Sequence, residues 1–250
     1  MSIVALELVS GVRLPIHTHT AARLVGAIVI VLAGTTVWQS RYFKDASTFW
    51  TRAVHDAPRS AEARYSLGYV HYVRGDLNAA EVHARAAIEL VPNNARRSPT
   101  YHLGLGLVYE GKGRLPEAAQ KYRDAIALDA KFALAHTNLG TIYYREGRLG
   151  DAEEKYRESI ALEPRFTLAY VNLCALRYQQ QRLAEAELFC RKALEIQGDS
   201  ERALVGLASV HYSQGRYQEA IRDVDQLAAR GVNVDQVIPG ITEALRAHRR

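Results

Sequence analysis

Cysteine is scarce in this chain, and the scarcity excludes two classes of small protein. Two cysteines in 250 residues cannot support a disulfide-dense scaffold or a zinc site built from four thiolates. Lysine and methionine are also rare, with six Lys against 26 Arg and a single Met. The net charge of +5 is small for a chain of this length. Charge alone therefore gives no reason to expect a nucleic-acid partner.

Motifs for catalysis are missing as well. The sequence has no glycine-rich phosphate loop, no paired metal-ligand motif and no recognisable nucleophile motif. The nine histidines are scattered, and His17 and His19 lack the further ligands that a metal ion requires. We therefore predict that the protein is not an enzyme and that it has no metal site and no cofactor.

The composition favours an ordinary folded chain that is rich in helix formers. Hydrophobic residues make up 48% and charged residues 24%, which excludes a disordered tail and a multipass membrane protein. The chain contains 37 Ala, and 14 of its 21 aromatic residues are Tyr. Tyrosine has an apolar ring and a polar tip, so it suits half-buried helix faces.

One apolar run stands near the N-terminus. Residues 24–38 carry no charge, and counting back past Arg23 to Ala21 gives eighteen residues. A membrane-spanning helix needs about 20 apolar residues, with a range of roughly 17–25. Three aromatic residues at the end of the run are typical of a membrane interface: Trp38, Tyr42 and Phe43. We predict a single-pass membrane anchor over residues 21–44, after an N-terminal segment of residues 1–20.

Two alternatives to the anchor stay open. A cleaved signal peptide has a weak small-residue site at residues 31–33, although the region before it is long. A buried core helix is the other alternative, since apolar runs of about 10–14 residues are often core helices. Flanking positive charges balance, so the side of the membrane that holds the rest of the chain is left open, with a preference for the extracytoplasmic side.

A repeat of 34 residues organises the rest of the sequence. Five copies align without internal gaps, and one insertion at residues 95–98 separates the first two. Each copy contains two helical patterns split by a turn. The copies cover residues 61–94, 99–132, 133–166, 167–200 and 201–234.

Three places in the repeat predict how its helices pack. The seventh residue is always Leu, and the eighth is small, which lets the second helix approach the first. A glycine ends the first helix in four copies, where a left-handed residue is favoured. The twentieth residue is always alanine and should fill the contact within the helix pair: Ala80, Ala118, Ala152, Ala186 and Ala220.

These features resemble the tetratricopeptide repeat (TPR) family. The 34-residue period, the Leu-small pair, the alanine at place twenty and the prolines at Pro92 and Pro164 all match it. The resemblance implies an all-α, right-handed solenoid of helix-turn-helix repeats. The second helix of the last copy is degenerate, as in a terminal repeat.

The repeat pattern continues beyond both ends of the five copies. Residues 45–60 match a second helix, with Ala46, Trp50 and Pro58 in register, so the apolar run would have to supply the partner helix of this half repeat. Residues 235–250 are expected to form a capping helix. The stretch from 20 to 94 also resembles the boundary between membrane helix and TPR array in multipass O-mannosyltransferase-like proteins.

The resemblance implies a concave groove lined by the first helix of each repeat. Tyrosine occupies the twelfth place in four copies, and asparagine occupies the sixth place in two. Tyr offers apolar area at low entropy cost, and an Asn amide can pair with an extended peptide backbone. Simple packing between repeats is an alternative explanation of the tyrosines. The candidate groove residues are Tyr72, Asn138, Tyr144, Asn172, Tyr178 and Tyr212.

Two further features allow more than one interpretation. Arginines recur at the turn of four copies and could attract acidic partners or lipid headgroups, but a solvated turn with acidic neighbours is the favoured interpretation. Cys174 and Cys190 fall across one helix pair. We expect two reduced, space-filling cysteines, although a disulfide is geometrically possible if the repeats are exported.

The sequence therefore predicts a membrane-anchored TPR scaffold that binds a protein or an extended peptide in its groove. The membrane contact would be made by residues 24–38. The alternative function is the TPR portion of a membrane glycosyltransferase, or a subunit that recruits its substrate.

Overall fold

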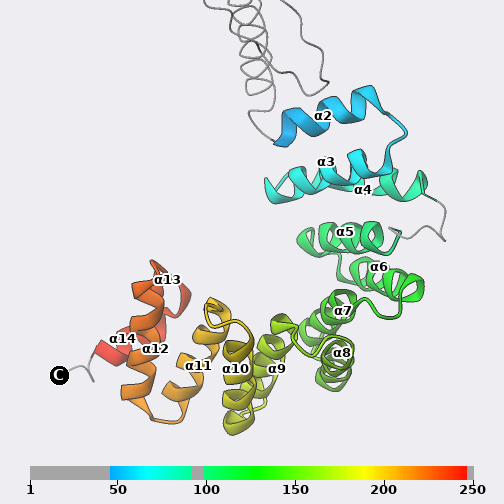
Figure 1. The fold of residues 1–250 in the computed structure, drawn as a ribbon. Coiled ribbons are helices and arrows are strands. Elements are labelled where there is room, and N and C mark those ends of the chain that lie inside the picture. Colours follow the sequence, from blue (N-terminus) through cyan, green and yellow to red (C-terminus); the bar gives the residue numbers. More distant parts are fainter. Residues whose placement is uncertain (1–45, 92–97, 247–250) are drawn as a thin grey trace, which may run out of the picture.

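The computed structural model describes residues 46–91 and 98–246, and every regular element in these ranges is a helix (Figure 1). None of these helices is both long and apolar enough to cross a membrane. The predicted anchor at residues 21–44 and the segment 1–20 lie outside the described residues. The helices are α2 Ala46–Asp56, α3 Ala61–Val73, α4 Leu77–Glu89, α5 Ser98–Gly111, α6 Leu115–Leu128, α7 Ala133–Arg145, α8 Leu149–Leu162, α9 Thr167–Gln179, α10 Leu183–Ile196, α11 Glu201–Ser213, α12 Tyr217–Ala229, α13 Val234–Val237 and α14 Pro239–Arg246.

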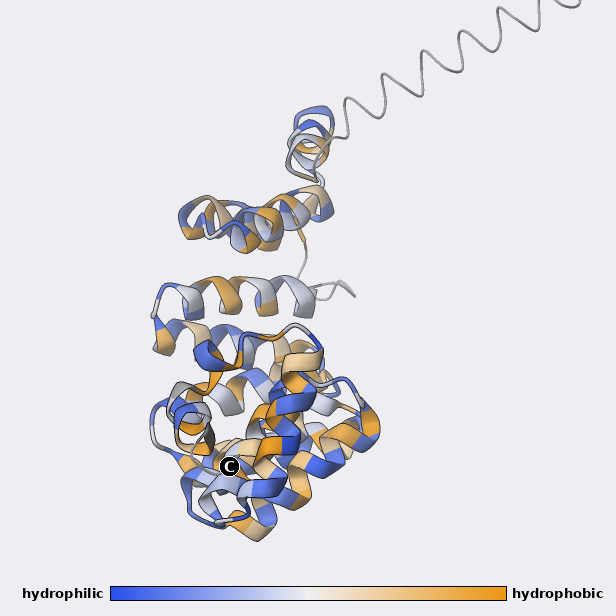
Figure 2. Ribbon diagram, turned by 90° about the vertical axis from the view of Figure 1, so that its left-hand side faces the viewer, coloured by the Kyte–Doolittle hydropathy of each residue, from blue (hydrophilic) through white to orange (hydrophobic). Residues whose placement is uncertain are grey.

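The helices stack in sequence order as a solenoid. Each first helix packs on the second helix that follows it, and each second helix packs on the next pair. First helices of consecutive pairs also touch, as in α3 with α5, α7 with α9 and α9 with α11. Figure 1 shows that the stack follows a curved path, and Figure 2 shows that the helices mix hydrophilic and hydrophobic residues. The predicted all-α solenoid is confirmed.

Small residues hold each helix pair together. All five alanines at place twenty are 0 % exposed. On the facing helix the glycines approach closely: a Cβ added to Gly106 would lie 2.5 Å from the Tyr122 ring, and one added to Gly140 would lie 2.7 Å from the Tyr156 ring. Since neither contact leaves room for a methyl group, the small residue at place eight sets the spacing of the pair.

The turns within the pairs are built from left-handed residues and paired charges. Gly75, Gly113, Gly147 and Gly215 all have φ between 73° and 80°, which confirms their predicted role. In the fourth copy Gln181 takes this conformation instead, with φ 58°. The residue that directly follows this left-handed position is an arginine in four copies, and it is the N-cap residue of the second helix.

The C-terminal helices cover the last repeat. Helix α14 packs against α12, and Leu245 is 2 % exposed in a cluster with Ala220 and Val224. At the other end of the array, α2 packs on α3 but contains no fully buried residue. Among the described residues, only the C-terminal end of the array therefore has its apolar face covered.

One expectation about the core was wrong. Cys174 of α9 and Cys190 of α10 form a disulfide, with their Cα atoms 5.3 Å apart. Both residues are almost completely buried, so they do fill space in the helix pair. However, places eight and twenty-four lie close enough across the pair for the two sulfurs to bond rather than merely touch.

Candidate binding groove

A groove of about 500 Å³ lies on the first-helix side of the C-terminal repeats. It runs across three first helices, from Tyr144 at the end of α7, over α9, to α11. The connection after α12 and the short helix α13 close one side of it with Val232 and Val237. The remaining lining residues are Val171, Cys174, Ala175, Tyr178, Glu201, Arg202, Val205, Gly206 and Ser209.

Two of the predicted tyrosines line this groove. Tyr144 and Tyr178 are both half-buried, so each presents part of its ring to the groove. Burial raises the pKa of the Tyr144 hydroxyl, which therefore stays protonated and able to donate a hydrogen bond. The Tyr178 hydroxyl lies 3.0 Å from Ser213 Oγ in the next repeat. The two rings thus combine apolar area with polar groups at the edge.

The two predicted asparagines differ in their surroundings. The Asn172 amide nitrogen donates to Thr141 Oγ1 at 3.2 Å, and its oxygen accepts a long hydrogen bond of 3.4 Å from Arg202. Asn172 is 8 % exposed, its amide is engaged within the protein, and it is not among the residues that line the groove. Asn138 is half-buried on α7 and is not among the residues that line the groove.

The other two candidate tyrosines lie away from this groove. Tyr72 borders a narrow space near the N-terminal repeats together with Tyr65 and Tyr69, and burial raises its pKa. Tyr212 packs against Tyr217, with 5.6 Å between ring centroids, in the C-terminal cluster. The predicted row of tyrosines is therefore divided among three places in the described array.

The groove also contains residues that were not named as candidates. Ala175 and Ser209 occupy place nine, and Val171 and Val205 occupy place five, so the repeat pattern could have identified them. The valines at 232 and 237 lie beyond the regular helix pairs, where periodicity gives no signal. Under the groove, a Cβ on Gly206 would lie 2.6 Å from Cys190 Sγ and 3.1 Å from Cys174 Sγ. The disulfide thus forms part of the support on which α11 rests.

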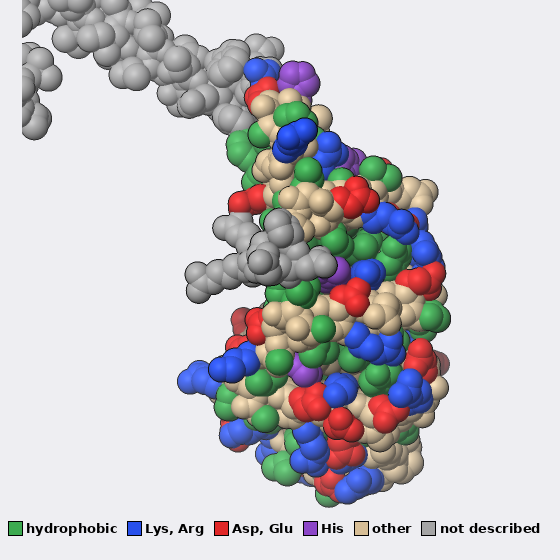
Figure 3. Space-filling model, turned by 90° about the vertical axis from the view of Figure 1, so that its right-hand side faces the viewer, with side chains coloured by type: hydrophobic (Ala, Val, Ile, Leu, Met, Phe, Trp, Pro, Cys, Tyr) green, Lys and Arg blue, Asp and Glu red, His purple; other side chains and the backbone are tan. Residues whose placement is uncertain are grey.

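The turn arginines are paired within the protein. Each precedes a second helix and donates from Nε to an acidic residue three positions later, at 2.9 Å for Arg114, 2.7 Å for Arg148 and Arg182, and 2.8 Å for Arg216. Figure 3 shows basic and acidic side chains interspersed on this face of the molecule. Because each positive charge has an acidic neighbour, the arginines form a neutralised turn rather than a basic surface.

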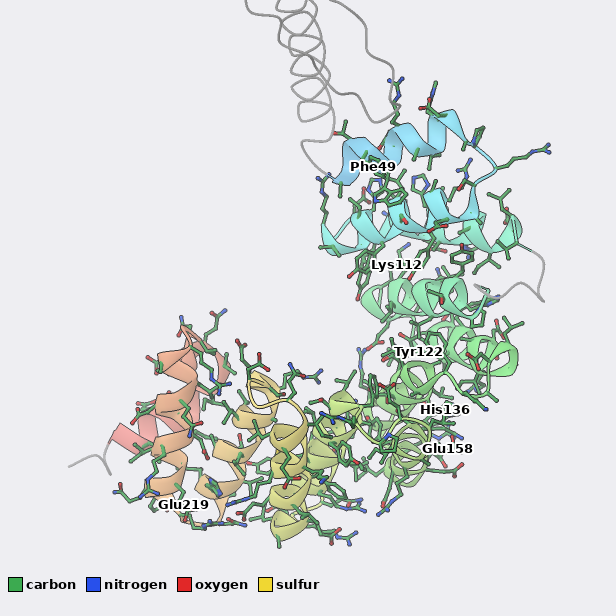
Figure 4. The ribbon with its side chains drawn as sticks, viewed as in Figure 1. Phe49, Lys112, Tyr122, His136, Glu158 and Glu219 are labelled. Carbon is green, nitrogen blue, oxygen red and sulfur yellow. A yellow bond between two sulfur atoms is a disulfide. The ribbon has the colours of Figure 1, made fainter. Side chains whose placement is uncertain are left out.

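No metal-ligand cluster occurs within residues 46–91 and 98–246. Two of the histidines found there pair with an acidic residue on the second helix of their own repeat. His136 Nδ1 of α7 lies 2.8 Å from Glu158 Oε2 of α8, and the two side chains stand side by side in Figure 4. His211 likewise lies 2.6 Å from Asp223 on the partner helix.

Comparison with protein families agrees with this architecture. Residues 102–230 match the model of the cilia and flagella-associated protein 70 middle TPR-like domain, and residues 31–95 match a tetratricopeptide repeat model. The chain belongs to the tetratricopeptide repeat family. The resemblance inferred from the 34-residue period is therefore confirmed.

Individual relatives cover different parts of this TPR chain. A protein O-mannosyl-transferase of Caenorhabditis elegans is 32% identical over 84 residues, which is 34% of this chain and 12% of the relative. The chain thus matches about an eighth of that protein's length.

Solved structures share the fold. PilF of Pseudomonas aeruginosa is 24% identical, with TM-score 0.62 over 71% of this chain and 79% of that one. Yeast Tom70 is 18% identical, with TM-score 0.67 over 82% and 43%.

Proposed function

We propose that this TPR protein is a scaffold that binds an extended peptide segment of a protein partner in the groove across α7, α9 and α11. The groove itself is the observation that supports the proposal: about 500 Å³ of mostly apolar space between two half-buried tyrosines. Small residues in the floor, including Ala175 and Gly206, leave room for the side chains of a peptide.

The polar edge suits the backbone of such a peptide. Bound backbone N–H and C=O groups lose water and need partners, otherwise each costs about 1–3 kcal/mol. The hydroxyls of Tyr144 and Tyr178 stand beside the apolar floor, and the Tyr178 hydroxyl already lies 3.0 Å from Ser213 Oγ. A peptide would gain affinity from the rings and would be aligned by these polar groups.

Affinity capture with paired substitutions tests the proposal. A partner is isolated on the immobilised full chain, and its dissociation constant is measured for Tyr144→Ala/Tyr178→Ala and for Asn138→Ala/Asn172→Ala. We expect a loss of about tenfold or more for the tyrosine pair, because buried aromatic anchors contribute the most to binding. The control is Arg148→Ala/Arg182→Ala, which alters two exposed turns. Normal binding by the tyrosine pair, together with loss of binding in the arginine pair, contradicts the groove and points to the turn edge.

The disulfide supports an oxidising location for the repeats. Disulfides persist in secreted, periplasmic and lumenal proteins and are rare where thiols are kept reduced. The Cys174–Cys190 bond therefore favours the extracytoplasmic side. The test is to block free thiols during extraction under denaturing conditions and to measure the protein's mass. An unmodified pair that reacts only after reduction supports this location, and direct modification of both cysteines contradicts it.

A role beside a membrane glycosyltransferase is the second candidate function. The 32% identity to part of a protein O-mannosyl-transferase favours it. In this role the groove would hold the acceptor polypeptide or the enzyme. Co-purification of a multipass transferase with the full chain, lost in the tyrosine-pair variant, supports this candidate. A captured partner with no link to glycosylation contradicts it.

Membrane attachment through residues 24–38 stays a prediction of the sequence. The apolar run is long enough to span a thin bilayer, but it lies outside the described residues. Retention of the full chain in membranes washed with alkaline carbonate would support the anchor. Release into the wash would contradict it.

A further inference from the structure

A second apolar cleft lies at the N-terminal end of the array, between α2 and α3. It has a volume of about 540 Å³. Apolar side chains beside it are unusually exposed, with Tyr69 at 54 % and Val73 at 66 %. The lining residues are Ala46, Trp50, Tyr65, Ser66, Tyr69, Val70, Val73 and Arg74. Exposed apolar side chains that lie together often mark a surface that packs against another segment or molecule, so we expect this cleft to be covered.

Helix α2 has the sequence pattern of a second helix, and within the described residues two places that are covered in the other pairs are open. Ala46 stands at place twenty and is exposed, whereas the alanines at this place in the five pairs are all 0 % exposed. Trp50 stands at place twenty-four and is only half-buried, whereas Tyr122 and Tyr156 at that place are 0 % and 1 % exposed. In every complete pair these two places are covered by the preceding first helix. The residues before α2 lie outside the described part of the chain, so the element that covers Ala46 and Trp50 is argued from the sequence.

The sequence before α2 continues the repeat register. Counting back 34 residues from Ala61 begins a further copy at residue 27, and place eight of this copy is Gly34. Place twelve, which is tyrosine in four copies, is Trp38. The match to the tetratricopeptide repeat model also begins at residue 31, well before α2. The repeat register therefore extends back to residue 27, and the family match extends back to residue 31.

We propose that residues 27–39 form the first helix of a further repeat and dock in the cleft between α2 and α3. Thirteen residues equal the length of α3, α7, α9 and α11. In this position Gly34 would allow close approach to Trp50, as Gly140 does to Tyr156. Ser66, at place six of α3, would face the docked helix, as Asn172 at the same place of α9 faces Thr141 of α7.

This placement competes with the predicted membrane span. Residues 27–39 cannot lie in a bilayer while they pack on α2, because α2 carries exposed charges such as Arg52 and Asp56. If residues 27–39 dock on α2, they correspond to the buried core helix, which is one of the two alternatives to a membrane anchor. The inference does not depend on the peptide groove, which lies at the other end of the array.

The native disulfide shows which two places of a repeat can be cross-linked, and an engineered disulfide at the same places tests the proposal. Cys174 and Cys190 occupy places eight and twenty-four of one pair, and their Cα atoms are 5.3 Å apart. The same two places in the proposed repeat are Gly34 and Trp50. Gly34→Cys/Trp50→Cys in the full chain should therefore form a second disulfide under mild oxidation. The bond is detected by peptide mapping with and without reductant, which also separates it from the native bond.

Two controls calibrate the cross-link. Gly68→Cys/Ala84→Cys places the same pair between α3 and α4, where a Cβ on Gly68 would lie 3.3 Å from Ala84 N. Thr35→Cys/Trp50→Cys turns the first cysteine about 100° around its helix. We expect the 34–50 pair to cross-link within about twofold of the 68–84 pair, and the 35–50 pair about tenfold less. Cross-linking of the 68–84 pair alone overturns the proposal.

A fluorescence measurement guards against misfolding of the cysteine variants. In Trp38→Phe, Trp50 is the single tryptophan of the chain. Gly34→Leu in this background should push the docked helix away and raise the quenching of Trp50 by acrylamide about twofold, since core sites do not accept added volume. Thr35→Leu is the matched control and should leave quenching unchanged. Equal quenching in the two variants, at the level of the parent, contradicts docking.

Discussion

The small residue at place eight is predicted to set the spacing of each helix pair, and Gly140 is the sharpest place to test this. A Cβ at Gly140 would lie 2.7 Å from Tyr156 Cε1, 2.9 Å from Cδ1 and 3.2 Å from the carbonyl oxygen of Ala152. Tyr156 is 1 % exposed, so its ring has little room to move. Burial also raises the pKa of its hydroxyl to about 12.

Two opposing effects decide the result of Gly140→Ala. Replacing a helical glycine by alanine is worth about 0.5–1 kcal/mol in backbone entropy. Adding a methyl group to a close-packed contact costs about 1–3 kcal/mol. The contacts below 3 Å involve a buried ring rather than a flexible chain end, so the packing cost should win. We expect a net loss of about 1–2 kcal/mol.

Gly150 on the neighbouring helix α8 is the matched control. Nothing lies within 4 Å of a Cβ added there, so Gly150→Ala should only gain helix propensity. Thermal unfolding of the two variants is followed by far-UV circular dichroism. For a domain of about 200 residues, 1 kcal/mol corresponds to roughly 2–4 °C. Gly140→Ala should therefore melt below the parent and Gly150→Ala slightly above it. An equal rise in both variants refutes the spacing argument.

Three further predictions concern the turns, the disulfide and acid stability. Gln181→Gly should raise the free energy of unfolding by about 0.5–1 kcal/mol in urea titrations, because Gln181 holds φ at 58°, whereas Gly147→Gln should lower it. Cys174→Ala/Cys190→Ala should lower it by about 3 kcal/mol, since the bond closes a short loop, and reductant should then no longer affect the protein. Glu187 is partly buried, which opposes ionisation, but hydrogen bonds from Arg191, Gln214 and Arg216 prevail and lower its pKa to about 2. Its contribution is therefore present above its ordinary pKa of 4.5 and is lost as the pH falls toward about 2, so Glu187→Gln should flatten the pH dependence of the unfolding free energy in that window.

The repeat could be read from the sequence because its packing depends on the size of single residues. Alanine at place twenty and glycine at the turn leave few alternatives, since a larger residue would not fit the pair and other residues rarely hold a positive φ. From these places the sequence alone predicts the family and the helical solenoid. Gln181 shows the limit of the rule, because the turn forms there without glycine.

The details of the groove could not be predicted in the same way. Arg202 reaches Asn172 from the next repeat, and such contacts depend on long side chains that a 34-residue pattern does not orient. Val232 follows the last helix of the final copy, and Val237 lies beyond that copy, so the helical pattern orients neither side chain. The disulfide was named only as an alternative, because two small apolar residues at places eight and twenty-four explain burial equally well, and spacing alone does not distinguish a bond from a contact.

The repeat pattern also did not predict that the charged side chain of Arg177 is buried. Arg177 is 2 % exposed at a place that holds His or Tyr in the other copies. It donates to Glu185 at 2.9 Å and to Glu153 of the preceding repeat. Its burial is tolerated only because both acids are present, and their approach depends on how the two pairs stack.

Photo-cross-linking from inside the groove tests the central claim most directly. Benzoylphenylalanine replaces Ala175, an exposed residue in the floor of the groove, and in a second variant it replaces Leu188, which is 63 % exposed on α10 outside the groove. Irradiation of cells that produce the full chain should attach a protein partner at position 175 and none at position 188. Attachment at 188 alone would contradict binding in the groove.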